Sequence, residues 1–398
     1  MNNNKTFILH LTLIENIGPA IIQKILQNKR SDISVSDLYL FSQTDWMHAF
    51  GFSESTAERL VKGLAHTKML EEELALIEQY NIQCMTFLDE SYPQLLKQIY
   101  LPPAVLYVQG SLLSLHTRAL AVVGARKADE YGHRIVNHLI PELVTADYTI
   151  VSGGALGIDA AAHHATIRTG GKTIAVLGSG LLVPYPLSNK KLFASIVEHG
   201  GALVSSFPLR MEALPGNFPA RNRIVTGLSH GCLVVQAAQK SGALISANYA
   251  LEQGREVFAI PGPIDSELSA GCNTLIQNGA KLVTCTADIL QEFGDRVILP
   301  DTKVMQEKVM QMSLESAIIP LSSMALATEG AKKIVDSYTQ YSDTQKQIIV
   351  ACKKPISFDD IIHTTQLTSE LLQTELFNLQ LDGIIKQDFT GMWVESSL

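Results

Sequence analysis

The residues of this chain best suited to chemistry are glycines and arginines that follow apolar runs. Residues 152–159 read Ser-Gly-Gly-Ala-Leu-Gly-Ile-Asp, and they separate the apolar run 148–151 from an alanine-rich stretch. A glycine-rich turn between a strand and a helix presents backbone N–H groups at the positive end of the helix, where a phosphate can bind. The candidate phosphate contacts are Ser152, Gly153, Gly154 and Gly157. Asp159 is expected to cap the helix. The alternative is that the turn only connects the strand to the helix and binds no ligand.

A second motif lies upstream, where the apolar run 120–123 ends in Gly124, Ala125, Arg126 and Lys127. Open α/β sheets bind ligands beyond the carboxyl ends of their strands. A guanidinium in that place can hold a phosphate through two parallel hydrogen bonds. We therefore predict a phosphate contact at Arg126; the alternative is a surface arginine in a salt bridge.

A third motif, residues 218–223, reads Phe-Pro-Ala-Arg-Asn-Arg. In an extended segment Arg221 and Arg223 would face one side and follow a nucleic-acid backbone while Phe218 stacks on a base. At the start of a helix the two arginines would point apart, and one would be structural. The candidate contacts are Phe218, Arg221, Asn222 and Arg223, and at least one arginine is expected to touch phosphate. No nucleophile–base pair, paired carboxylates or metal-ligand set is evident, so we expect no catalytic residue, cofactor or metal.

The elements that would position these motifs alternate between strands and helices over residues 81–292. The expected strands are Gln83–Phe87, Ala104–Gln109, Leu120–Gly124, Thr149–Ser152, Thr173–Leu177, Ala202–Ser205, Gly231–Val235 and Val257–Ile260. The expected helices include Tyr131–Ala146, Asp159–Thr169, Leu187–His199 and Ala243–Gln253. Continuous apolar strands are typical of a parallel sheet covered on both faces. The fold class is therefore α/β, a doubly wound, Rossmann-like parallel sheet.

Smaller domains are expected on either side of this sheet. Residues 1–80 read as short helices of the helix-hairpin-helix or SAM-like class, with either DNA-backbone contact or simple packing as their role. Residues 293–341 have no clear period and read as a linker. Residues 342–398 read as three helices and a strand pair, which is a winged helix. Its expected recognition helix, residues 369–381, has no basic residue, so we expect this domain to contact protein or its own chain.

Composition favours a cytoplasmic protein without a membrane span. No run of eighteen apolar residues occurs, and the polar start of the sequence does not resemble a signal peptide. The five cysteines are scattered and lack metal-ligand spacing, which indicates a reducing compartment. The net charge is −8, but residues 101–288 carry 14 Lys and Arg against 12 Asp and Glu. An acidic whole does not exclude nucleic acid, because binding depends on the local patch.

Taken in order, the motifs resemble the DNA-processing protein A family (DprA, also called Smf) over nearly the full length. The matching pieces include Tyr92-Pro93, residues 102–107, Val123–Arg126, Val151–Gly154, Gly157–Asp159, His163, residues 173–178, Tyr185-Pro186, Phe218–Arg223, Ser241-Gly242, residues 254–259, Pro261-Gly262 and Gly271–Asn273. The resemblance implies a protein that binds single-stranded DNA entering by natural transformation, protects it and loads the RecA recombinase. It also implies a homodimer formed through the Rossmann-like domain, no established catalytic step, and DNA contacts at Arg126 and Lys172.

This chain departs from the family pattern at two points. Ser205-Ser206 stands where the family often has Ser-Glu, and Val235-Gln236-Ala237 stands where it often has Val-Glu-Ala.

The competing hypothesis is a Rossmann-like nucleotide-binding enzyme, such as a nucleotide phosphoribohydrolase. That enzyme class would need a Pro-Gly-Gly-x-Gly-Thr-x-x-Glu loop, and the nearest approach here is Pro261-Gly262-Pro263.

Overall fold

The chain divides into two compact units. The computed structural model describes residues 3–29, 33–294 and 342–352, and farther on residues 356, 358–365, 367, 372, 375–376, 379–380, 384–387 and 393–395. One unit combines Met1–Leu13 with the chain from His66, and the other contains Ile14–Ala65 and the C-terminal part. The expected single domain 1–80 is thus divided, because its first helix and its last belong to the unit that contains the sheet. The linker was expected over residues 293–341, but Phe293 ends a helix and Gly294 caps it; residues 295–341 lie outside the described residues.

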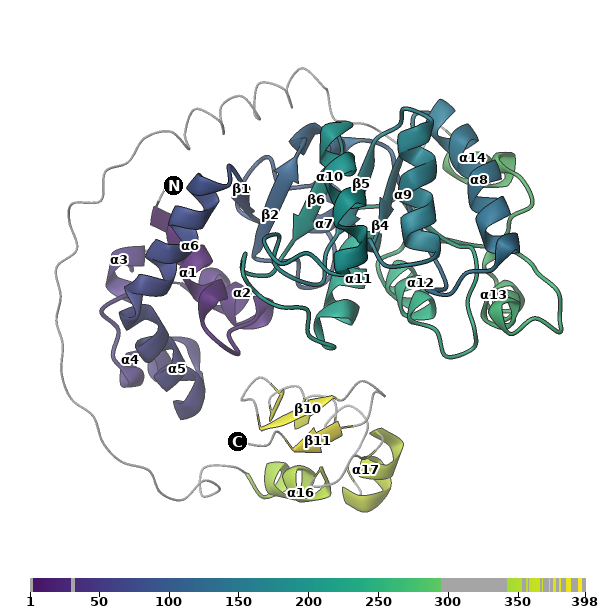
Figure 1. The fold of residues 1–398 in the computed structure, drawn as a ribbon. Coiled ribbons are helices and arrows are strands. Elements are labelled where there is room, and N and C mark those ends of the chain that lie inside the picture. The colour runs from purple at the N-terminus through teal and green to yellow at the C-terminus, as the bar shows by residue number, and fades with distance from the viewer. Residues whose placement is uncertain are drawn as a thin grey trace. The chain divides into compact units, whose positions relative to one another are not determined.

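The sheet of the first unit has nine strands in the order β1-β2-β6-β5-β4-β3-β7-β8-β9 (Figure 1). Its strands are β1 (Gln83–Thr86), β2 (Val105–Gly110), β3 (Ala119–Val123), β4 (Thr149–Ser152), β5 (Thr173–Val176), β6 (Ala202–Ser205), β7 (Gly231–Val234), β8 (Glu256–Ala259) and β9 (Lys281–Leu282). Strand β2 runs antiparallel to both of its neighbours, and all the other pairs are parallel. The chain moves outward from β3 to β6 and then returns to place β7 on the other side of β3. This reversal is the switch point at which doubly wound sheets bind ligands.

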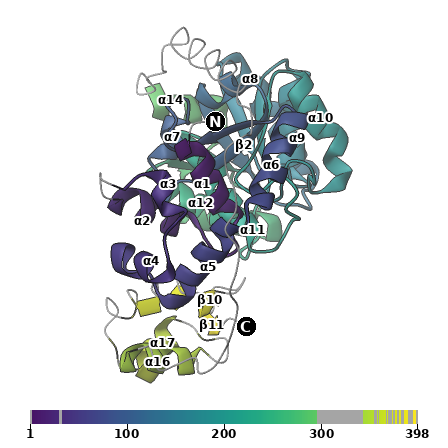
Figure 2. The same ribbon diagram turned by 90° about the vertical axis from the view of Figure 1, so that its left-hand side faces the viewer.

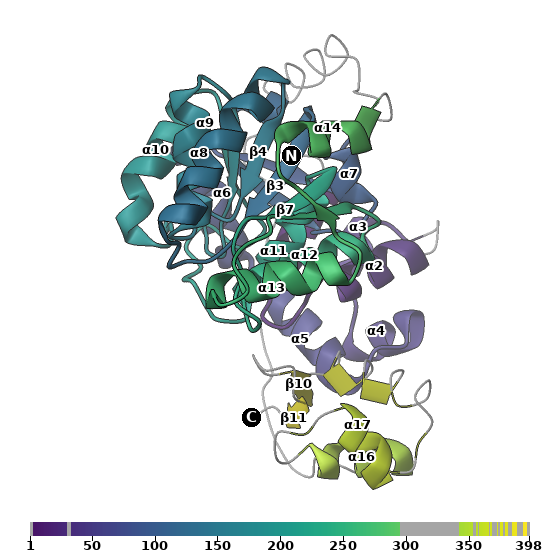
Figure 3. The same cartoon turned by 90° about the vertical axis from the view of Figure 1, so that its right-hand side faces the viewer.

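Helices cover both faces of this sheet (Figure 3). The helices of this unit beyond β1 are α7 (Gln94–Lys97), α8 (Glu130–Thr145), α9 (Ile158–Arg168), α10 (Lys190–Glu198), α11 (Asn217–Gly227), α12 (Gly242–Glu252), α13 (Glu267–Gln277) and α14 (Thr286–Phe293), with short 3₁₀ turns at Leu112–His116 and Leu187–Asn189. Successive residues of a strand point to opposite faces. Leu120 and Val122 therefore pack with α8, α9 and α14, whereas Ala121 and Val123 pack with α7, α11, α12 and α13.

The edge of the sheet at β1 and β2 is joined by two helices from the start of the chain (Figure 2). Helix α1 (Asn3–Leu13) packs on β1 and β2, and α6 (Thr67–Gln79) packs on α1. The buried carboxylate of Glu73 on α6 accepts a hydrogen bond of 2.8 Å from the backbone N–H of Leu209. Helix α6 therefore fixes the segment between β6 and α11.

The helical part of the second unit comprises α2 (Pro19–Asn28), α3 (Val35–Leu38), α4 (Gln43–Phe50) and α5 (Glu54–Ala65). Ser42 and Asp45 cap the start of α4 reciprocally, and Gly51 ends it in the left-handed conformation. The hydroxyl of Ser53 accepts the N–H of Thr56 at the start of α5.

The C-terminal described residues include α16 (Asp343–Ala351), α17 (Phe358–Thr365) and the antiparallel pair β10 (Ile385–Gln387) and β11 (Trp393–Glu395). Leu372, Leu376 and Leu379 are buried. The winged-helix assignment stays a prediction. Within the described part of the chain, no helix is long and apolar enough to span a bilayer.

Replacing Glu73 with Gln should change how stability depends on pH. Burial raises the pKa of the Glu73 carboxyl, while the N–H of Leu209 and the charge of Arg210 oppose the shift. The folded protein thus holds this proton more tightly than the unfolded chain, where the pKa is about 4.3. Native stability should fall as pH rises from that value through the higher folded value. Glu73→Gln keeps an acceptor for Leu209 and has no proton to lose. The difference in melting temperature, variant minus parent, should therefore increase from acid to neutral pH.

Circular-dichroism melts at several pH values measure this difference. Glu71→Gln, at an exposed position of the same helix, is the matched control and should show no such trend. A parallel pH dependence for the parent and Glu73→Gln would contradict the account.

Candidate nucleic-acid interface

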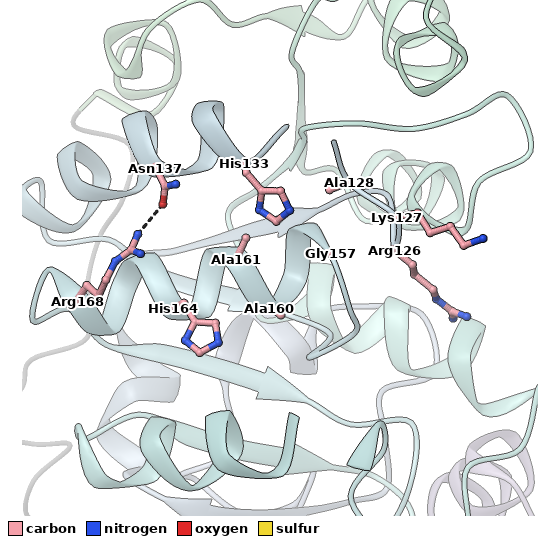
Figure 4. Close-up of a pocket in the computed structure, with 10 residues that line it drawn as sticks. All are labelled: Arg126, Lys127, Ala128, His133, Asn137, Gly157, Ala160, Ala161, His164 and Arg168. Atoms are coloured by element: carbon pink, nitrogen blue, oxygen red, sulfur yellow. Dashed lines mark hydrogen bonds between the residues drawn. The ribbon is translucent and has the colours of Figure 1, made fainter. Parts of the chain in front are cut away.

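The loop that follows β3 presents two cations at the carboxyl edge of the sheet. Arg126 and Lys127 are exposed, and neither forms an ion pair with another residue that the structure describes (Figure 4). Ala125 is buried and its carbonyl accepts the N–H of Ile158, the first residue of α9. Gly124 packs so closely on Ile158 that a Cβ would lie 2.6 Å from that side chain. The main chain of this loop is thus fixed while its two cations remain available.

An aromatic pair lies beside Arg126. The guanidinium carbon of Arg126 is 5.3 Å from the ring centroid of Phe218, within cation–π range. The ring of Tyr185 lies 5.8 Å from that of Phe218, and Tyr185 is 49% exposed. We call Arg126, Lys127, Tyr185 and Phe218 the stacking site. Two partly exposed rings next to unpaired cations suit a strand whose bases are unstacked from any partner.

The glycine-rich turn after β4 faces inward instead. Both the N–H of Gly153 and that of Ala155 donate to the carboxylate of Asp159, at 3.1 and 3.3 Å. Asp159 is thus the cap that the sequence indicated, and its buried carboxylate occupies donors that a phosphate would need. The hydroxyl of the buried Ser152 donates to Val122 at 2.6 Å, and Gly154 is buried against Phe193. These contacts correct the assignment of Ser152, Gly153 and Gly154: they shape the turn, and we take them out of the proposed contact set.

Gly157 connects this turn to the cationic loop. It has a φ of +75°, and a Cβ there would collide with the carbonyl oxygens of Ala125 and Arg126. Only glycine combines this conformation with so close an approach. Gly157 therefore sets the position of Arg126 and does not need to touch a ligand itself.

The third motif is helical, so its polar side chains point apart. Arg221 is buried, and its guanidinium donates to the carbonyls of Gly153 and Val176. Arg223 donates to the carbonyls of Tyr100 and Leu101, both at 2.6 Å. Asn222 donates to Gly242 on α12 at 3.3 Å. The helical alternative raised by the sequence is the one observed, and these three residues join segments of the protein instead of lining the stacking site.

Burial has a clear electrostatic effect beneath the turn. It raises the pKa of Asp159, and the guanidinium of Arg221 opposes this shift. Burial also lowers the pKa of His163 to about 3, so this imidazole is neutral; its Nδ1 lies 2.7 Å from the hydroxyl of Thr173. His163 is therefore a packing residue. Within the described ranges, no group of three or more His, Cys, Asp or Glu side chains could hold a metal ion.

Lys172 is not brought to the stacking site. Lys172 immediately precedes β5, and its carbonyl accepts the N–H of Ile150 on β4. Lys172 therefore lies at the amino ends of the parallel strands. Arg126 follows the carboxyl end of β3, so Arg126 and Lys172 lie at opposite ends of the parallel strands. Tyr185 was the functional candidate that the sequence did not single out; its place in the matched Tyr185-Pro186 pair was the available signal.

Comparison with known proteins agrees with this architecture. Residues 83–294 match the family model described as DNA recombination-mediator protein A. The chain belongs to that family. It is 31% identical over 406 residues to the protein Smf of Synechocystis, an alignment that covers 97% of this chain and 98% of that protein.

Two further relatives match part of this chain. The DNA processing protein DprA of Bacillus subtilis is 42% identical over 224 residues, which cover 56% of this chain and 75% of that protein. The crystal structure of DprA from Streptococcus pneumoniae superposes with a TM-score of 0.63 at 35% identity, covering 73% of this chain and 98% of that one.

The two positive-φ glycines at the ends of α9 provide a test of the turn. Gly157→Ala should lower the free energy of unfolding by about 2 kcal/mol or more, because the methyl group meets two carbonyl oxygens. Gly170 has a φ of +78° with no atom within 4 Å of a Cβ. Gly170→Ala is therefore the matched control, and it should cost only about 1 kcal/mol. Chemical denaturation measures both, and equal losses would show that the close approach of Gly157 is unimportant.

Proposed function

We propose that this chain binds single-stranded DNA through the stacking site, protects it during natural transformation and passes it to the RecA recombinase. The observation that carries the proposal is the exposed guanidinium of Arg126 at 5.3 Å from the Phe218 ring, with Tyr185 beside it. Arg126 and Lys127 would neutralise phosphates, and the rings would stack on bases. Rings can reach the faces of bases only when the bases are unpaired, which favours single strands over duplex.

The family supports the same function. The relative from Bacillus subtilis is named a DNA processing protein, and so is the relative whose crystal structure superposes on this chain. Delivery to RecA rests on the family resemblance. No catalytic step is part of the proposal, and the buried Asp159 is already occupied by backbone donors. We also propose that the protein works in the cytoplasm, in keeping with five cysteines that form no disulfide.

Arg126→Ala should weaken binding of single-stranded oligonucleotides and flatten its salt dependence. Each phosphate that is no longer neutralised should lower the slope of log K against log salt by about 0.7. Phe218→Leu should instead weaken binding about tenfold or more with little change in that slope, because stacking releases no counterions. Lys68→Ala, an exposed cation on α6, is the control for loss of one charge. Fluorescence anisotropy at several salt concentrations measures all four proteins, and unchanged affinity and slope for Arg126→Ala would exclude the site.

We also propose that the chain forms a homodimer through the domain that contains the sheet. Large apolar side chains are exposed on the elements around the last strands, namely Leu251 on α12, Ile264 in the loop after β8 and Leu282 on β9. Their burial against a second copy would be favourable. A chain without residues 340–398 should therefore remain a dimer in light scattering at micromolar concentration, and Ile264→Asp should shift it toward monomer. A monomeric truncated chain would contradict this assignment.

A further inference from the structure

A groove between α8 and α9 leads away from the stacking site and is lined by cations and imidazoles (Figure 4). It has a volume of about 420 Å³. Ten residues line it. Arg126 and Lys127 lie at one end and Arg168 at the other, and the helices between them carry His133 on α8 and His164 on α9 (Figure 4). The function proposed above uses only the first of these ends.

The charge of the groove is one-sided. It contains three permanent cations and two imidazoles, and none of these ten lining residues is acidic. The nearby carboxylates are directed elsewhere: Glu130 is 3.9 Å from Arg134, and Asp129 accepts hydrogen bonds from Gly132 and Gln236. Like charges brought together without counter-charges repel one another, so an anionic occupant would be stabilised here.

The floor of the groove permits close approach. Gly157, Ala160 and Ala161 present little or no side chain, so a ligand can lie near the surface of α9. His164 and Arg168 are four residues apart on α9 and therefore share one face of the helix. Arg168 also donates to the side-chain oxygen of Asn137 on α8 at 2.5 Å, which holds its guanidinium across the far end of the groove.

The length of the groove suits a chain of phosphates better than a single anion. The eleven residues Ile158–Arg168 of α9 extend about 16 Å at 1.5 Å per residue. That distance corresponds to about five nucleotides of a stacked strand. The groove is continuous with the stacking site, because Arg126 and Lys127 belong to both.

We propose that the groove between α8 and α9 is a second phosphate-binding track for the same DNA strand. The strand passes from the stacking site along α9, and His133, His164 and Arg168 contact its phosphates. This inference rests on the proposed function, which it extends from one contact point to a path with a direction. It follows that a short oligonucleotide fills the stacking site alone, whereas a longer one also occupies the groove.

Two oligothymidylates, of about 4 and about 20 nucleotides, separate the two parts of the path. A triple variant combines Arg168→Gln, His133→Gln and His164→Gln. All three side chains are exposed, so the fold should stay intact. We expect the triple variant to bind the long oligonucleotide about tenfold more weakly, with a salt slope lower by about 0.7 for each phosphate left without a cation, and to bind the short one like the parent. Arg126→Ala should weaken both. Lys97→Ala, exposed on α7, is the matched charge control.

The outcomes distinguish the two proposals. If the parent binds both oligonucleotides and the triple variant binds the long one as tightly as the parent, the groove is not part of the path. A triple variant that loses affinity for both lengths equally would also overturn a separate track. If the parent retains neither oligonucleotide, the proposed function fails, and the track fails with it.

Discussion

The buried guanidinium of Arg221 is the interaction on which the rest of the site depends. It donates to the carbonyls of Gly153 on the turn after β4 and of Val176 on β5, from a position on α11. The carboxylate of Asp159 lies close enough to stabilise the positive charge of Arg221. The same carboxylate accepts the N–H groups of Gly153 and Ala155 and so caps the turn. A buried charge without such partners would cost several kcal/mol, so one arrangement of turn, strand and helix is strongly preferred.

That arrangement places the exposed groups. Because Arg221 fixes the first turn of α11, the ring of Phe218 three residues earlier is held toward Arg126, and both guanidinium groups lie within 6 Å of that ring. Gly157, at the start of α9, allows the helix to lie directly against the backbone of Ala125 and Arg126. The same helix then forms one wall of the groove that ends at Arg168. One network of internal bonds thus supports both the stacking site and the path leading from it.

The strands of the sheet could be predicted from the sequence because a buried strand appears as a short, continuous run of mainly apolar residues. Thr149–Ser152 and Ala202–Ser205 are fully buried strands, and the sequence predicted the bounds of both to the residue. The roles of Arg221 and Arg223 could not be predicted in this way. Their partners are carbonyls between 45 and 123 residues away, and backbone acceptors carry no signal in the sequence.

The glycine-rich turn illustrates the same limit. A strand, glycines and a helix predict N–H groups at a helix end, but whether these donors are available depends on Asp159, which folds back on them. The two-residue pattern Arg126-Lys127 was more informative, since exposed cations directly after a central strand have few internal partners to satisfy. The groove could not be predicted without knowing that α8 packs on α9, which brings His133 and His164 to the same groove (Figure 4).

Photochemical cross-linking of the full chain to a single-stranded oligonucleotide, followed by mapping of the modified peptides, tests the central claim most directly. Aromatic rings stacked on bases are well placed to react, so the account predicts adducts on the peptides that contain Tyr185 and Phe218. Adducts found only on peptides from residues 14–65 or 342–395, with none on those two, would contradict it.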